Sequence, residues 1–121
     1  MSIELDEVAD DIYSKVKESL ESDWNTLSTF HRSQGRKLAR QAALLAQLKL
    51  SGEVPPDDPI FETLNKQFED AARNFAQAVA NLTVVTLQNA WNAIINTLWG
   101  AVNELLSGAG LGLLPIPKLG D

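Results

Sequence analysis

The chain has 121 residues and a formal net charge of −6, and 45% of its residues are hydrophobic. This length fits a single domain, and the absence of cysteine excludes disulfides and thiolate metal sites. The single histidine, His31, excludes a site built from several histidines, and the acidic balance makes duplex nucleic acid an unfavourable partner.

The first predicted helix covers about residues 3–51. Its beginning is acidic and lacks the pattern of a signal peptide, which predicts synthesis in a cytoplasm. Ser2 is a suitable N-cap, and apolar residues then recur with a period of about 3.6 along the whole span. Residues of low helix propensity around Gly35 are where this helix would kink or break. Gly52 suits the left-handed position at the end of the helix.

The second predicted helix covers about residues 59–106, after a short connection that contains two prolines. Asp58 as N-cap and Pro59 at the first helical position are a strong start signal. The span from Asn74 to Asn103 has no ionisable side chain, and its amides recur at helical spacing. We call these residues the amide stripe: Asn74, Gln77, Asn81, Gln88, Asn92, Asn96 and Asn103. An amide face on an otherwise apolar helix predicts a helix enclosed by other protein or, less favourably, by lipid.

The last segment, residues 109–121, is an apolar tail. It is predicted to be non-helical because it contains three glycines and two prolines. Residues 1–108 are predicted to form one domain, an all-α antiparallel hairpin of the two long helices. Folding back at the paired prolines places the basic residues 36–40 opposite residues 69–73, which include two acids.

One contact between two helices buries too little apolar surface to offset the conformational entropy lost on folding. Two solutions follow from this. Either long hairpins associate into an oligomeric bundle or ring, or the helices break near Gly35 and Asn81 into a compact four-helix bundle. We favour the oligomer, in which the tail docks in a groove on a neighbouring copy.

The residues expected at contacts between copies combine large apolar side chains, central members of the amide stripe and the tail. They are Leu20, Trp24, Asn81, Gln88, Trp91, Asn92, Asn96, Trp99, Leu113, Leu114 and Ile116. The aromatic residues among them would pack in a core or between subunits, in preference to anchoring at a membrane surface.

The sequence contains no phosphate-binding loop, nucleophile elbow, catalytic triad or cluster with metal-ligand spacing. It therefore predicts no enzymatic activity, no catalytic residue, no cofactor and no metal site. Arg32, Arg36 and Arg40 form a basic row, but without interleaved aromatic residues we expect them to pair with acids of the chain, so a nucleic-acid partner is disfavoured. The uncharged span is long enough to cross a bilayer, although each of its central amides would need a partner in lipid.

Several short strings, Lys37-Leu38-Ala39, Leu48 to Glu53 and Asp70-Ala71-Ala72-Arg73, precede an alanine- and asparagine-rich helix. Over residues 35–105 this pattern resembles small all-helical proteins of tailed bacteriophages. The resemblance implies a virion-associated or assembly role with other virion proteins as partners, and it brings no catalytic residues. The first hypothesis is thus a non-enzymatic phage assembly protein, made in the host cytoplasm and located in the virion. The alternatives are a membrane-active ejection or lysis factor that inserts the second helix, and a small regulator that binds helices of another protein.

Overall fold

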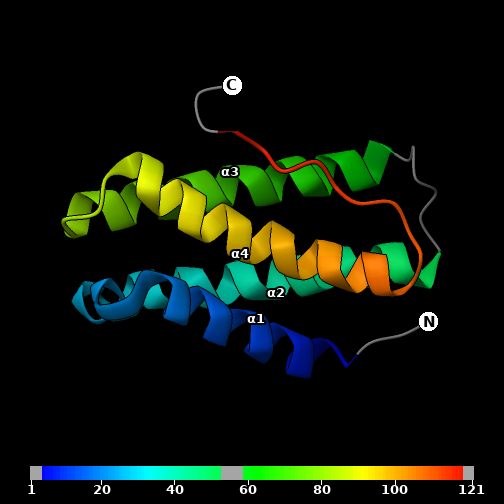
Figure 1. Ribbon diagram of the computed structural model, residues 1–121, viewed down its shortest axis with the longest axis horizontal. Coiled ribbons are helices and arrows are strands. Elements are labelled where there is room, and N and C mark those ends of the chain that lie inside the picture. Colours follow the sequence, from blue (N-terminus) through cyan, green and yellow to red (C-terminus); the bar gives the residue numbers. More distant parts are fainter. Residues whose placement is uncertain (1–3, 53–58, 119–121) are drawn as a thin grey trace.

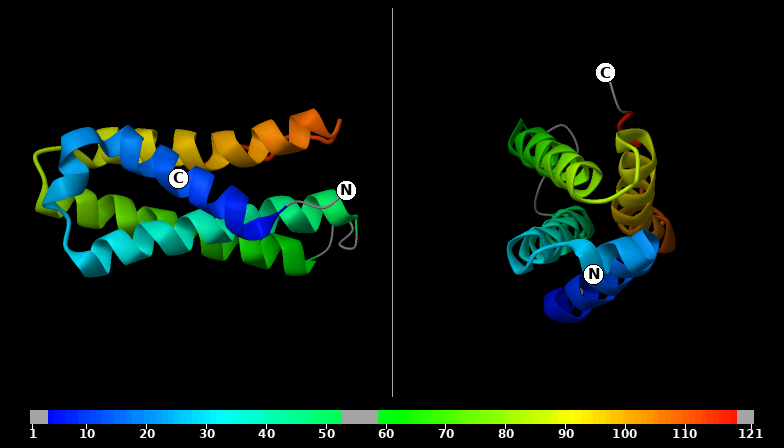
Figure 2. Two further views of the ribbon diagram at one scale, coloured as in Figure 1. Left: turned by 90° about the horizontal axis from the view of Figure 1, so that it is seen from below. Right: turned by 90° about the vertical axis from the view of Figure 1, so that its left-hand side faces the viewer.

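The structure is a computed structural model that describes residues 4–52 and 59–118. Its elements are α1 (Leu5–Leu20), the 3-10 helix η1 (Glu21–Thr26), α2 (Thr29–Ser51), α3 (Pro59–Leu82) and α4 (Leu87–Gly108). The four α-helices lie side by side in a bundle (Figure 1), and the end view in Figure 2 shows them around a common centre. The prediction of an all-α fold is confirmed for the described part of the chain.

Two of the predicted helix boundaries are confirmed. Gly52 follows α2 with a φ of 72°, the left-handed conformation that favours glycine, and α3 begins at Pro59. The expected caps at Ser2 and Asp58, the connection 53–58 and the tail residues 119–121 lie outside the described residues.

The expected helix over residues 3–51 is divided into two antiparallel helices, so the prediction of one continuous helix is wrong. After α1 and η1, Ser28 caps α2, and its side-chain oxygen accepts a hydrogen bond from the His31 backbone N–H (3.2 Å). The chain reverses at this cap, before the break expected near Gly35. The physical reason is that a serine cap satisfies the free N–H groups of a new helix start.

Gly35 itself lies inside α2 and is buried. A Cβ at this position would be 3.2 Å from the ring of Trp24 and 3.3 Å from the ring of Phe75. The lack of a side chain therefore allows η1 and α3 to pack closely on α2. Close packing explains why a glycine stands at this position, and α2 continues through it despite the low helix propensity of glycine.

This close contact predicts that Gly35→Ala lowers the free energy of unfolding by about 1 kcal/mol, because the cost of overpacking exceeds the gain in helix propensity. Gly100 is a matched control inside α4, where a Cβ would meet nothing within 4 Å. Gly100→Ala should raise the free energy of unfolding by about 0.5–1 kcal/mol. Urea unfolding followed by circular dichroism measures both changes, and equal stabilisation by the two substitutions would contradict the packing at Gly35.

The expected helix over residues 59–106 is also divided, between Leu82 and Leu87. Thr83 donates its hydroxyl hydrogen to the Val79 carbonyl (2.7 Å), and Thr86 accepts a hydrogen bond from the Asn89 backbone N–H (3.1 Å). These side-chain bonds to the backbone end one helix and begin the next. The predicted long hairpin is therefore wrong, and the alternative compact bundle, with its second break close to Asn81, describes the chain.

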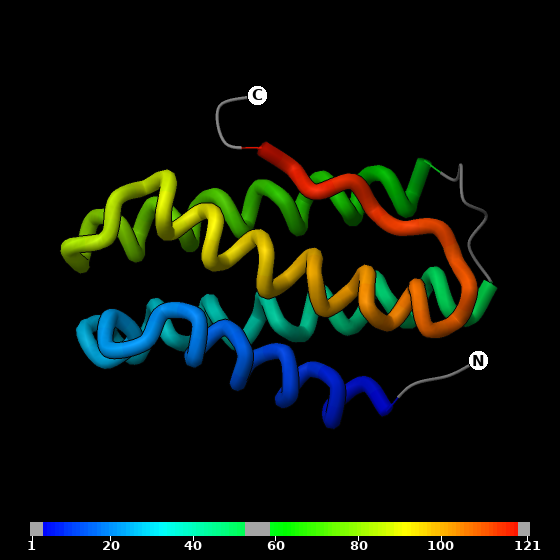
Figure 3. Tube along the Cα trace, viewed as in Figure 1, coloured from blue at the N-terminus to red at the C-terminus, as the bar shows by residue number. Residues whose placement is uncertain are grey.

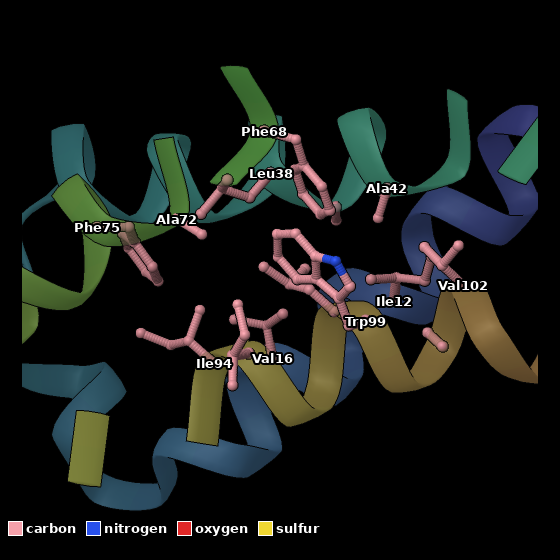
Figure 4. Packing of buried hydrophobic residues seen from close by; sticks show 14 of the residues in the cluster. Ile12, Val16, Leu38, Ala42, Phe68, Ala72, Phe75, Ile94, Trp99 and Val102 are labelled. Atoms are coloured by element: carbon pink, nitrogen blue, oxygen red, sulfur yellow. The ribbon is translucent and has the colours of Figure 1, made fainter. Parts of the chain in front are cut away.

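The core is one apolar cluster to which all four α-helices, η1 and the tail contribute. At its centre the rings of Phe68 and Trp99 are stacked, with 4.2 Å between their centroids and an angle of 15° between their planes. Figure 4 shows Ile12, Val16 and Ile94 directed toward the same centre. No charged or polar residue of the described part is buried in this core.

The ion-pair partners of the basic residues of α2 differ from those that were expected. Arg36 and Arg40 pair with Asp10 (3.6 Å) and Asp6 (2.7 Å), so the basic row of α2 faces the acids of α1. The predicted register of α2 against α3 is kept, since a Cβ at Gly35 would be 3.3 Å from the Phe75 ring and Lys49 Nζ lies 4.7 Å from the ring centroid of Phe61. What differs is the ion-pair partner, because Arg36 and Arg40 pair with acids of α1. The reversal at Ser28 brings α1 back along α2, and this places the first acidic segment beside the basic one.

Candidate functional site

The amide stripe divides into two parts because α3 and α4 are separate helices. Six of its seven amides are exposed, and only Asn103 is half-buried. Gln77 Nε2 donates a hydrogen bond to Asn81 Oδ1, and Gln88 Nε2 donates one to Asn92 Oδ1, both at 3.0 Å. Within one copy the stripe is therefore not enclosed, and its enclosure by another protein stays a prediction. Amides four residues apart bond to each other along one helix and remain in contact with water.

The amide of Asn103 holds the tail. Its Oδ1 accepts a hydrogen bond from the Leu114 backbone N–H (2.7 Å), and its Nδ2 donates one to the Leu114 carbonyl (3.0 Å). One side chain thus satisfies both backbone groups of one tail residue. Leu114 is only 8% exposed and belongs to the core cluster. The tail therefore docks on its own chain, and the prediction that it docks on a neighbouring copy is wrong.

A second contact holds the end of the described tail. Arg73 of α3 donates a hydrogen bond from Nη2 to the Lys118 carbonyl (3.0 Å) and pairs with Glu69 at 3.2 Å. Its guanidinium carbon lies 4.9 Å from the ring centroid of Trp91 in α4. As the traces in Figures 1 and 3 show, the tail runs back between α3 and α4. Arg73 therefore connects α3, α4 and the tail.

A pocket of about 410 Å³ lies where the tail passes the first half of α4. Its helix wall combines apolar and amide side chains, namely Gln88, Trp91, Asn92, Ile95 and Asn96. Its other wall is formed by Ile116, Pro117 and Lys118. The tail thus covers the apolar edge of α4 beside the amides, whereas Gln88 and Asn92 are bonded to each other.

No known family model, curated protein or solved structure matches this chain. Two of the strings that resemble phage proteins lie inside α2 and α3, where Leu38, Ala39 and Ala72 are buried core residues, and the described part of the third, Leu48 to Gly52, ends α2. Their buried residues therefore contribute to the packing of the helices.

Four of the residues predicted at contacts between copies are core residues of a single copy. Leu20, Trp24, Trp91 and Trp99 are all buried, and Trp24 also packs edge-on against Tyr13, with 5.4 Å between ring centroids. In one copy these four side chains are not accessible, because the breaks in both long helices let the chain enclose its own tryptophans. Leu114 is buried in the same core.

The other predicted contact residues are accessible. Asn81, Gln88, Asn92 and Asn96 are exposed, and in the tail Leu113 is 61% and Ile116 47% exposed. The sequence reasoning missed Leu82, which is exposed, and Val84, which is 96% exposed between α3 and α4. The sequence indicates exposure at this place only through two valines, Val84 and Val85, that are flanked by threonines in an uncharged span. We call the following exposed residues the uncharged surface: Asn74, Gln77, Asn81, Leu82, Val84, Gln88, Asn92, Asn96, Leu113 and Ile116.

Two further findings concern chemistry and membranes. Within the described ranges, no three or more His, Cys, Asp or Glu side chains are arranged to hold a metal ion. None of the helices in the same ranges has the length and apolar character needed to cross a bilayer. The single histidine, His31, lies at the start of α2 with its Nδ1 2.7 Å from the Ser28 hydroxyl, in the cap of the helix.

Proposed function

We propose that this protein is a non-enzymatic assembly protein of a bacteriophage particle, made in the host cytoplasm, which associates with copies of itself and with other virion proteins through the uncharged surface. The observation that supports this most directly is the exposure of that surface. Its amides and apolar side chains are accessible although the span from Asn74 to Asn103 contains no ionisable group.

The distribution of charge supports the same proposal. Every ion pair of the described part lies between Asp6 and Arg73, on α1, α2 and α3. Removing an amide from water and pairing it across an interface costs less than removing a charge. The cores of protein interfaces are correspondingly depleted of lysine and glutamate. A partner therefore meets the smallest desolvation cost on the uncharged surface.

The closed core defines what kind of association this is. Because the three tryptophans are buried within one chain, a single copy has its own core and the copies would associate as folded units. The apolar part of the contact would come from exposed side chains such as Val84 and Ile116. Such an association is expected to depend on protein concentration, since the complex is not required for folding.

Light scattering coupled to size-exclusion chromatography tests this association. Between roughly 1 and 200 µM protein, we expect the mass to rise above the 13.2 kDa of one chain. The double variant Val84→Lys/Asn92→Lys places two charges on the uncharged surface and should return the mass to that of a monomer. The matched control Ser14→Lys/Ser33→Lys adds the same charge at exposed positions of α1 and α2 and should leave the mass unchanged.

Two results would contradict the proposed association. The first is a mass of one chain over the whole concentration range. The second is an oligomer that Val84→Lys/Asn92→Lys and the control variant affect equally, because the contact would then lie elsewhere or depend only on net charge.

A further inference from the structure

A second accessible feature is a groove between α1 and α4, with a volume of about 960 Å³. The two helices run in opposite directions and separate toward the N-terminal turn of α1 and the C-terminal end of α4 (Figures 1 and 2). One face of α1, from Glu4 to Lys15, and one face of α4, from Ala101 to Gly108, line this groove. It is separate from the uncharged surface, which lies on other residues.

The floor of the groove is apolar. Ile12 and Ala101 are buried beneath it, and Val8 and Leu105 are half-buried and remain partly accessible. Val8 and Ile12 are four residues apart on α1, and Ala101 and Leu105 are four residues apart on α4, so each pair lies on one face of its helix and together they form an apolar strip. A partner with apolar side chains at the same helical spacing would cover it.

The rim of the groove is acidic. Glu4, Glu7, Asp11 and Glu104 lie around the floor, and the one base there, Lys15, is 3.3 Å from Asp11. Within residues 4–52 and 59–118, Glu4, Glu7 and Glu104 have no ion-pair partner. Glu104 is also the only ionisable residue of α4. The groove therefore presents an excess of negative charge above an apolar floor.

We propose that this groove binds a basic amphipathic helix of a partner protein. Its apolar side chains would contact Val8, Ile12 and Leu105, and its lysine or arginine side chains would meet the acidic rim. From Glu4 to Lys15 the groove extends about 16 Å at 1.5 Å per residue, which matches about three turns of a bound helix. The acidic rim disfavours the anionic surface of a membrane as the occupant.

The charge of the chain argues against a second copy as the occupant. Seven of its ten bases already contact groups of the same copy, and these include Arg32, Arg36 and Arg40 of the basic row. A second copy has no described helix with a free basic face to offer. The partner is therefore a different chain, and the inference does not depend on self-association through the uncharged surface.

A labelled synthetic peptide tests the groove directly. The probe is a peptide of about 14 residues with leucines at steps of three and four and lysines beside them. Fluorescence anisotropy with the full chain should show micromolar binding at about 50 mM salt and about tenfold weaker binding at about 500 mM salt. A scrambled peptide of the same composition should bind about tenfold more weakly, and the same peptide with glutamate in place of lysine should not bind.

Matched charge reversals locate the contact. Glu7→Lys/Glu104→Lys should weaken binding by about 30-fold, whereas Glu62→Lys/Asp70→Lys, the same charge change on exposed positions of α3, should keep the affinity within about threefold. Circular dichroism confirms that both variants are folded. Amide chemical shifts should move in α1 and the second half of α4. Equal losses in the two variants, failure of the basic peptide to bind, or shifts centred on residues 74–92 would each overturn the proposal.

Discussion

Replacing Trp99 with alanine is expected to lower the free energy of unfolding by about 4 kcal/mol. The side chain is fully buried, and its ring stacks on Phe68 at the centre of the cluster shown in Figure 4. Its removal deletes these contacts and leaves a cavity that the four surrounding helices cannot fill without moving. Against a typical domain stability of about 5–15 kcal/mol, this loss would leave the variant marginally folded. Urea unfolding followed by circular dichroism measures it.

The conservative variant Trp99→Phe separates ring packing from the indole N–H. Trp99 Nε1 is buried without a hydrogen-bond partner in the described part of the chain, so the native tryptophan carries a desolvation cost of about 1–3 kcal/mol. Phenylalanine keeps an aromatic ring beside Phe68 and removes this cost, so we expect a loss of less than about 1.5 kcal/mol. A loss below about 1 kcal/mol for Trp99→Ala would contradict its position in the core.

The helical character and several helix ends could be predicted from the sequence because they depend on local chemistry. Apolar residues with a period of 3.6, glycine at position 52 and proline at position 59 act on their own segments of backbone. The breaks at Ser28 and Thr86 are local as well, but each is a single capping residue inside a longer apolar pattern. The low helix propensity of Gly35 predicted a break there and not at Ser28, but the packing of Trp24 and Phe75 explains that glycine.

The ion-pair partners of α2 could not be predicted from charge because two acidic segments compete for the same bases. The basic segment that contains Arg36 and Arg40 has acids before it in the chain and acids after it. Both a long hairpin and a reversal at Ser28 therefore bring bases beside acids. In the folded chain α2 lies beside both α1 and α3, and the ion pairs of Arg36 and Arg40 form with Asp10 and Asp6 of α1.

The candidate site was predicted in part, and the errors have one physical cause. The absence of charge on residues 74–103 predicts contact of the amide stripe with other protein, and the long hairpin leaves the tryptophans to a core or to an interface between subunits. An amide such as Gln88 can remain in water when it bonds to Asn92 one turn away. Trp91 and Trp99 are buried because the second break turns α4 back along α3, which one continuous helix could not do.

The tail provides the second large effect. Asn103→Ala is expected to lower the hydrogen-exchange protection of the Leu114 backbone amide by about 30-fold, which corresponds to about 2 kcal/mol. The substitution removes both hydrogen bonds to Leu114, and an unpaired backbone carbonyl and N–H then oppose burial of its side chain. Hydrogen exchange followed by nuclear magnetic resonance measures the change at this residue, and the global stability should fall by less than about 1 kcal/mol.

Asn96→Ala is the matched control, because Asn96 is an exposed amide of the same helix and has no hydrogen bond to the tail among the described residues. It should leave the protection of Leu114 within about twofold of the native value. Asn103→Asp should give an intermediate loss, since a carboxylate accepts from the Leu114 N–H but cannot donate to its carbonyl. Unchanged protection in Asn103→Ala would mean that the buried Leu114 side chain holds the tail without the amide. Losses in the two Asn103 variants but not in Asn96→Ala would show that one member of the amide stripe fixes the position of Leu113 and Ile116 on the uncharged surface.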